Sequence, residues 1–170
     1  KASAEKNAEV GDRSNDSVRI DATELRVRVA GEGGNLGFTQ KARIEYALAG
    51  GRINTDAVDN SGGVDCSDHE VNIKILLDLL LEQGIIDSRD ERDRLVEEVV
   101  EDVCDMVLAD NETQSLCLSL DLVRSRKNVA PFVETQERLA RGGLLDRRGE
   151  SLPTEKELLS RSEASYTRPE

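Results

Sequence analysis

Aromatic side chains are almost missing from this chain, which has two Tyr, two Phe and no Trp in 170 residues. A hydrophobic core built from this sequence is therefore mainly aliphatic, and the aromatic platforms on which single-stranded nucleic acids stack are lacking. A formal net charge of -12 also repels a phosphate backbone. Together these features predict that nucleic acid is not a partner.

Long apolar runs and evenly paired cysteines are missing as well. No stretch approaches the ~18 apolar residues that a membrane-spanning helix needs, and no charged-then-apolar leader is seen. We therefore expect neither membrane insertion nor secretion. The three cysteines, Cys66, Cys104 and Cys117, are odd in number and show no C-x-x-C spacing. This pattern favours reduced thiols and a cytoplasmic location.

The ends of the chain lack the features of a complete protein. The sequence starts with Lys1, its one methionine is Met106, and it stops at Glu170 without an obvious terminal element. We therefore expect it to be a piece of a longer polypeptide.

Two glycine-rich segments are the most informative features that are present. Residues 31–37 follow an alternating pattern at 25–29 that predicts a strand, and they precede a helical pattern at 40–49. Residues 60–63 follow a second predicted strand at 53–58. Strand, helix and strand in this order predict a βαβ unit with a parallel sheet, whose ligands bind at the carboxyl ends of the strands.

Beyond residue 63 the apolar residues recur at three- and four-residue spacing, which predicts helices. The stripe at 71–80 predicts a long helix. Asn111 is expected to cap a later helix, Pro131 to lie in the first turn of another, and Thr154 to open the last one with a capping box.

The local patterns also have plainer interpretations. The glycines at 31–37 fit no regular dinucleotide fingerprint, so on spacing alone a tight turn is favoured over a cofactor loop. Ser67 and Glu70 have the spacing of a capping box. Capping of the helix that follows is therefore favoured over donation of the Ser67 hydroxyl to an anionic substrate.

No metal site is predicted. His69 is the only histidine, and Cys66 lies three residues before it. Two ligands cannot complete a zinc site, and Asp65 and Asp68 are expected to be solvated. The same spacing makes Cys66 and His69 a poor nucleophile pair.

Taken together, the motifs resemble those of the large NAD-specific bacterial glutamate dehydrogenases. The resemblance rests mainly on Gly-Glu-Gly-Gly-Asn-Leu-Gly-Phe-Thr-Gln at 31–40 and on Asn-Ser-Gly-Gly-Val-Asp-Cys-Ser-Asp-His-Glu at 60–70. Shorter matches follow the same family: 9–16, 110–111, 143–147 and 167–170. The resemblance implies an α/β fold, with the C-terminal part of a Rossmann-like dinucleotide-binding domain (βαβ) at 1–63 and an all-helical region at 64–170.

The smaller hexameric glutamate dehydrogenases have comparable segments, and the resemblance implies roles by position. Asn35 and Asn60 would face the nicotinamide end of NAD, and Ser67 would hold a carboxylate of glutamate. The glycines that would permit close approach of the cofactor are Gly33, Gly34, Gly62 and Gly63. Gly34 and Ser61 replace alanines of the smaller enzymes.

The resemblance also implies an activity: oxidative deamination of L-glutamate to 2-oxoglutarate and ammonia with NAD, by an expected homo-oligomer. The family's catalytic lysine and aspartate would lie outside this chain, so no catalytic residue is assigned and the chain alone is expected to be inactive. Two alternatives stay open. One is a non-catalytic helical interaction module, and the other is an amino-acid dehydrogenase of different specificity.

Overall fold

The computed structural model describes residues 1–33 and 37–170. Within this part the chain forms eight α-helices and two 3₁₀ helices. In chain order they are α1 (Asn7–Val10), η1 (Arg13–Asn15), η2 (Ala22–Glu24), α2 (Gln40–Leu48), α3 (Asp56–Asp59), α4 (Ser61–Glu82), α5 (Arg89–Glu98), α6 (Val100–Lys127), α7 (Ala130–Arg141) and α8 (Glu155–Ser160).

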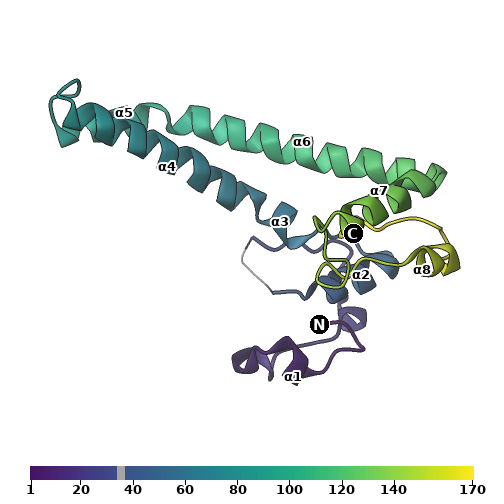
Figure 1. Cartoon of the computed structure of the whole chain (residues 1–170). Coiled ribbons are helices and arrows are strands. Elements are labelled where there is room, and N and C mark those ends of the chain that lie inside the picture. Colours follow the sequence, from purple (N-terminus) through teal and green to yellow (C-terminus); the bar gives the residue numbers. More distant parts are fainter. Residues whose placement is uncertain (34–36) are drawn as a thin grey trace.

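The molecule has a compact part and a long helical hairpin that projects from it (Figure 1). The hairpin consists of α4 and α6, which pack against each other, with α5 at the far end. Gly84, with a φ of 68°, turns the chain after α4 in the left-handed conformation that glycine adopts readily. The hydroxyl of Ser88 then accepts a hydrogen bond from the Glu91 N–H and caps α5.

The predicted βαβ unit is wrong. The described residues contain no strand, and the two extended segments meet only in a single parallel bridge between Val29 and Arg52. Val27 and Val29 are 53% and 65% exposed, so the alternating pattern has no sheet face against which to pack. An isolated pair of strands is marginal in water, which is why two extended segments alone do not form a sheet. No Rossmann-like unit is present in this part of the chain.

The second predicted strand also differs from the structure. The sequence 56–59 forms the short helix α3, whose first turn contains Asp56 and Asp59. Carboxylates are favourable at a helix N-terminus because they complement the helix dipole. The glycine segment 60–63 is likewise not a turn, because α4 begins at Ser61. The predicted domain boundary at 63/64 therefore falls in the first turn of α4, and the division into domains stays a prediction.

The core of the compact part is small and lies between α2, η2 and the segment before α3. Its buried members are Ala22, Ala42, Tyr46 and Ile53. The Tyr46 hydroxyl donates to the Val27 carbonyl at 2.6 Å, so the ring's polar end is satisfied. This core fixes α2 against the segments on either side of it.

The C-terminal residues tie the compact part to the hairpin. The Arg168 guanidinium donates to the Asn54 side chain at 2.7 Å and to the Ser119 hydroxyl on α6 at 2.7 Å. The Gln40 side chain donates to the Pro169 carbonyl at 2.7 Å. Segments far apart in sequence are thus joined at the base of the hairpin.

Several helix predictions are confirmed. The stripe at 71–80 lies in α4, Pro131 lies in the first turn of α7, and Thr154 caps α8 with a capping box to Glu157. The predicted helix start at Asn111 is wrong, because α6 runs through this residue without a break. None of the helices that the structure describes has the length and apolar character needed to span a membrane.

Candidate functional site

A buried arginine on α2 organises the region around the two glycine-rich segments. Arg43 is fully buried, with 0% of its surface exposed. Its guanidinium donates to Glu32 at 2.9 Å, to Asp59 at 2.7 Å and to Asp56 at 3.3 Å. A further bond of 2.9 Å goes to the Asn54 carbonyl. A planar guanidinium with several fixed donors can hold such a set of oxygens at once, which an ammonium cannot do in the same geometry.

Glu32 closes the first glycine-rich segment on itself. One carboxylate oxygen accepts from the Gly37 N–H at 2.6 Å, and the other accepts from the Phe38 N–H at 3.2 Å as well as from Arg43. A Cβ on Gly37 would lie 2.8 Å from the Glu32 Cδ atom, so any other residue at 37 would require the carboxylate to shift from this position. The segment is thereby fixed at both of its ends.

Arg43 joins the two segments that the sequence singles out. Glu32 directly precedes Gly33 in the first segment, and Asp59 directly precedes Asn60 in the second. Both carboxylates bind the same guanidinium. The predicted cofactor residues Gly33 and Asn60 therefore belong to neighbouring parts of the structure, although the sheet that was expected to align them is absent from the described residues.

The charge of this cluster is negative. Three carboxylates surround one guanidinium, which also lies over the Phe38 ring with its central carbon 5.4 Å from the ring centroid. Arg43 Nε is buried and has no hydrogen-bond partner in the described part of the chain. The formal charge is thus anionic next to both glycine-rich segments, an environment that favours a cationic group over a phosphate.

The first turn of α4 is packed closely against α6. The Ser61 hydroxyl, on a residue only 7% exposed, lies 2.5 Å from the Asn111 amide oxygen. The Asn111 amide nitrogen donates to the Val107 carbonyl at 2.7 Å. A Cβ on Gly62 would lie in ordinary contact, 3.5 Å, with Asn111. One on Gly63 would come within 3.0 Å of the Asn60 side-chain oxygen, so glycine there leaves room for the Asn60 amide.

Ser67 does not cap a helix, contrary to the sequence prediction. It lies inside α4, on an exposed part of the helix, because α4 begins at Ser61. Glu70, the other half of the predicted capping box, pairs with Lys74 instead, and this partner lowers the pKa of the Glu70 carboxyl. Ser67 is therefore an exposed residue within α4 and not the cap of that helix.

The remaining predicted residues fall into two groups. Among the described residues, 1–33 and 37–170, nothing lies within 4 Å of the position where a Cβ on Gly33 would stand. Gly34 and Asn35 lie outside the described residues. The structure therefore relates Gly33, Asn60, Gly62 and Gly63 to one region, with Ser67 further along α4.

Sequence reasoning missed the residues that hold this region together. Arg43 lies within a predicted apolar helix face, and one signal was its position between Ala42 and Ile44, both of which are buried. The acidic residues that flank both glycine-rich segments were a second signal, because a buried arginine needs such partners. Ser61 and Asn111 are separated by most of the hairpin, and no local pattern relates them.

The comparison with known families agrees with the motifs. Residues 1–121 match the model of the family described as bacterial NAD-glutamate dehydrogenase, catalytic domain. The chain is also similar to curated proteins named NAD-specific glutamate dehydrogenase. That of Mycobacterium tuberculosis is 50% identical over the whole chain. Those of Halomonas elongata and Pseudomonas aeruginosa are each 47% identical over 96% of the chain.

The chain spans about a tenth of the length of each of these relatives. The family match covers both glycine-rich segments, Arg43 and its carboxylate partners, and most of the hairpin. The resemblance seen in the motifs is thereby confirmed, and the chain belongs to the family of bacterial NAD-glutamate dehydrogenases.

Proposed function

We propose that this chain is part of an enzyme that oxidatively deaminates L-glutamate to 2-oxoglutarate and ammonia with NAD. Family membership supports the reaction, since the relatives are named NAD-specific glutamate dehydrogenases. The share of this chain is to position the nicotinamide end of the cofactor and one carboxylate of the substrate. Geometry at the reacting carbons governs the rate of such a transfer, so positioning groups matter even where they take no part in the chemistry.

The observation that carries this proposal is the Arg43 guanidinium, which binds Glu32 of the first segment and Asp59 of the second. A ligand that contacts both segments needs them held at a fixed separation. A buried arginine with several hydrogen bonds supplies this, because its removal leaves uncompensated charge.

The residues present fit the nicotinamide end of NAD better than its pyrophosphate. The cluster of Glu32, Asp56 and Asp59 is anionic overall, which suits the cationic ring of the oxidised cofactor and disfavours phosphate. No residue that the structure describes fills the space beside Gly33, which leaves its backbone accessible to a ligand. The residues assigned to cofactor binding are Gly33, Gly34, Asn35, Asn60, Gly62 and Gly63.

Ser67 is assigned to the substrate carboxylate. Its exposed position inside α4 keeps the hydroxyl available to a partner outside the helix. With the family's catalytic lysine and aspartate expected outside this chain, the 170 residues alone should show no turnover. We further propose a homo-oligomeric, cytoplasmic enzyme; the free state of Cys66, Cys104 and Cys117 is consistent with a reducing compartment.

The cofactor assignment is tested by Asn60→Ala in the full-length protein. We expect the KM for NAD to rise at least several-fold while the KM for glutamate changes little. Asn72→Ala is the matched control, since Asn72 is an exposed asparagine further along α4 that donates to the Asp68 carbonyl. Equal effects of the two substitutions on the KM for NAD would contradict the assignment.

The substrate assignment is tested by Ser67→Ala, which we expect to raise the KM for glutamate and leave that for NAD unchanged. Ser160→Ala is the control, because Ser160 is exposed on α8 and its hydroxyl donates to the Glu157 carbonyl of the same helix. Unchanged kinetics in both Asn60 and Ser67 variants would favour the helical interaction module. Normal kinetics with a different amino acid would favour another dehydrogenase specificity.

A further inference from the structure

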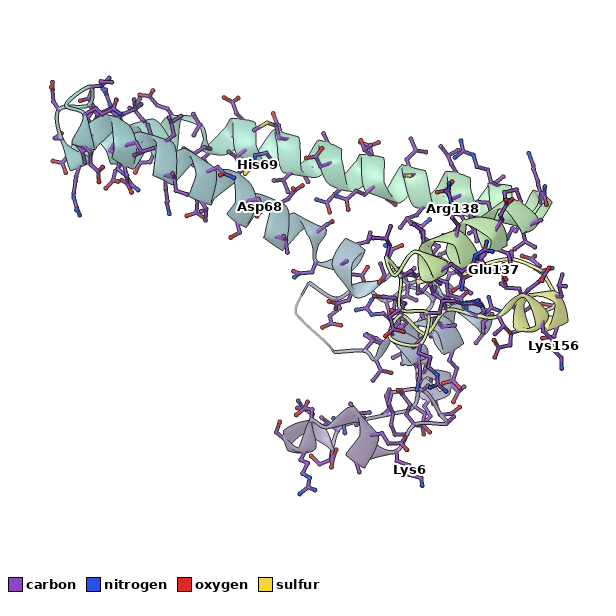
Figure 2. All side chains as sticks on the ribbon, in the orientation of Figure 1. Lys6, Asp68, His69, Glu137, Arg138 and Lys156 are labelled. Atoms are coloured by element: carbon purple, nitrogen blue, oxygen red, sulfur yellow. The ribbon has the colours of Figure 1, made fainter. Side chains whose placement is uncertain are left out.

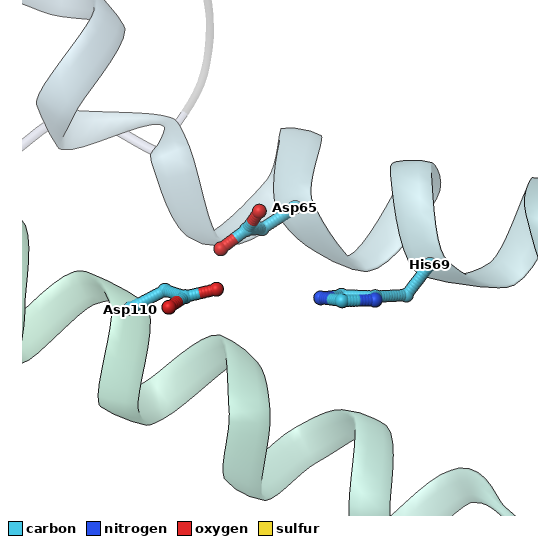
Figure 3. Close-up of side chains that lie close together, drawn as sticks. All are labelled: Asp65, His69 and Asp110. Carbon is cyan, nitrogen blue, oxygen red and sulfur yellow. The ribbon is translucent and has the colours of Figure 1, made fainter.

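A second polar cluster lies between the two long helices, on the side of α4 that faces α6. Asp65 and His69 are one helical turn apart on α4, and Asp110 approaches them from α6 (Figure 3). One ligand atom from each residue lies within 4.8 Å of the others. Residues four apart on a helix share a face, so Asp65 and His69 point to the same gap.

This cluster is incompletely satisfied by the protein. The Oδ2 atom of Asp65 is buried and has no hydrogen-bond partner among the described residues. Neither Asp65 nor Asp110 forms an ion pair with any lysine or arginine in the described ranges, 1–33 and 37–170. A buried carboxylate oxygen without a partner is costly, and a bound cation is one way in which such an oxygen is satisfied.

This arrangement is not predicted by any local pattern in the chain. Cys66 and His69 are too few to complete a zinc site, and Asp65 was expected to be solvated. In the structure Asp65 is half-buried, and the third ligand comes from another helix. Asp68 is exposed, as expected, and Figure 2 shows it on the other side of α4 from His69.

We propose that Asp65, His69 and Asp110 bind a divalent transition-metal ion, with Zn²⁺ the best match, that bridges α4 and α6. One imidazole and two carboxylates are ligands that Zn²⁺ accepts, whereas Mg²⁺ and Ca²⁺ prefer oxygen alone. Ligand atoms around Zn²⁺ at ~2.1 Å are ~3.4 Å apart in a tetrahedron, so separations of up to 4.8 Å need to shorten by at most about 1.4 Å on binding. Asp110 is exposed and its side chain can supply this movement.

The site has a defined effect on the neighbouring structure. It lies one turn beyond the contact between Ser61 and Asn111, which already sets the register of the two helices. Three protein ligands leave one position for water, because Zn²⁺ is usually four-coordinate. The bound ion would therefore act as a clamp that holds the start of α4 against α6. Ser67, two residues along the helix from both Asp65 and His69, lies on a different face of α4.

The proposal is tested by calorimetric titration of Zn²⁺ into the full-length protein after treatment with a chelator. We expect wild type to bind Zn²⁺ at a site that is weakened at least tenfold by Asp65→Asn, by His69→Gln and by Asp110→Asn. Zn²⁺ should also raise the melting temperature of wild type and have a smaller effect on these variants. Asp110 is exposed, so Asp110→Asn tests the site without threatening the fold.

Asp68→Asn is the matched control for Asp65→Asn, because it removes the same charge from an exposed position on the same helix. Asp105→Asn serves in the same way for Asp110→Asn on α6. We expect both control variants to bind Zn²⁺ as wild type does. Absence of Zn²⁺ binding to wild type would overturn the proposal. Equal binding by wild type and all three ligand variants, or equal losses in the control variants, would also overturn it.

Discussion

The compact part and the projecting hairpin are held together in different ways. In the compact part a fully buried arginine binds three carboxylates. The hairpin buries few residues, among them Leu77 on α4 and Val107 on α6. It exposes many apolar side chains, including Val71, Ile75, Leu76, Leu79, Leu116 and Leu120.

This difference has a physical meaning. A buried charged network fixes the relative positions of its members, because any displacement leaves a charge uncompensated. In the hairpin only a narrow line of residues between α4 and α6, the seam, is buried. Most substitutions on the remaining surface should therefore be tolerated. The part of the molecule whose residues are held most tightly in relative position is therefore the region beside the two glycine-rich segments. Paired substitutions in the two regions can therefore test this contrast.

The largest effect is expected from Arg43→Met. The substitution keeps an unbranched side chain but leaves Glu32, Asp56 and Asp59 facing one another without a cation. Breaking a buried ion pair in this way typically costs about 3–5 kcal/mol. We expect urea unfolding of the purified chain to show a loss of this size in the free energy of unfolding.

Arg92→Met is the counterpart in the hairpin. Arg92 also binds two carboxylates, Asp78 at 2.7 Å and Asp93 at 2.6 Å, but the side chains of these partners are 58% and 64% exposed. Exposed ion pairs contribute little to stability, so unfolding should be almost unchanged. Similar losses for Arg43→Met and Arg92→Met would remove the contrast between the two regions.

A smaller effect is expected within the hairpin itself. Leu77 is 8% exposed and the adjacent Leu76 is 57% exposed, so the two leucines differ mainly in burial. We expect Leu77→Ala to cost about 2–4 kcal/mol in urea unfolding of the chain, since it leaves a cavity in the seam. Leu76→Ala should stay within about 0.5 kcal/mol of wild type. Equal losses in the free energy of unfolding for the two variants would show that Leu77 does not lie in the buried contact between α4 and α6.

The smallest effect concerns the cap of α8. Thr154 donates to Glu157 from its backbone N–H and from its hydroxyl, and these bonds hold the pKa of the Glu157 carboxyl below its ordinary value of 4.5. Because the folded pKa is the lower one, the carboxylate stabilises the fold above about pH 4.5. This contribution is lost as the pH falls through the folded pKa.

The corresponding measurement is the melting temperature of the chain against pH. Glu157→Gln should lower it slightly at neutral pH and by less in acid, where the wild-type carboxyl is protonated. Glu155→Gln, a substitution at an exposed position in the same turn, is the control. A difference between wild type and Glu157→Gln that grows with acidity would contradict the sign of this effect.

The helical half of the fold could be predicted from the sequence because its signals are local. The apolar spacing at 71–80, Pro131 and the Thr154 capping box each depend on residues within a few turns of one another. The predicted helix start at Asn111 was wrong because asparagine is a common helix cap. In the structure its side chain instead contacts Ser61 across the hairpin.

The compact half was predicted less well because its decisive contacts are not local. Alternation at 25–29 indicates a strand only when neighbouring strands and a covering layer exist, and Val27 and Val29 have neither in the described structure. The motifs nevertheless identified the family correctly. They did not identify Arg43, because the role of a buried arginine becomes visible only when its carboxylate partners are placed.

The role of Arg43 and Glu32 is tested most directly by the substitution Glu32→Gln in the full-length protein. Glu32 contacts Arg43 and closes the first glycine-rich segment without being assigned to the cofactor itself. Glu45→Gln is the matched control, since Glu45 lies on the same helix as Arg43 but accepts hydrogen bonds from Ser3. Steady-state kinetics should show a KM for NAD that rises several-fold for Glu32→Gln alone, with the KM for glutamate nearly unchanged. An unchanged KM for NAD in a folded Glu32→Gln protein would contradict the claim that Arg43 and Glu32 hold the cofactor segments in place.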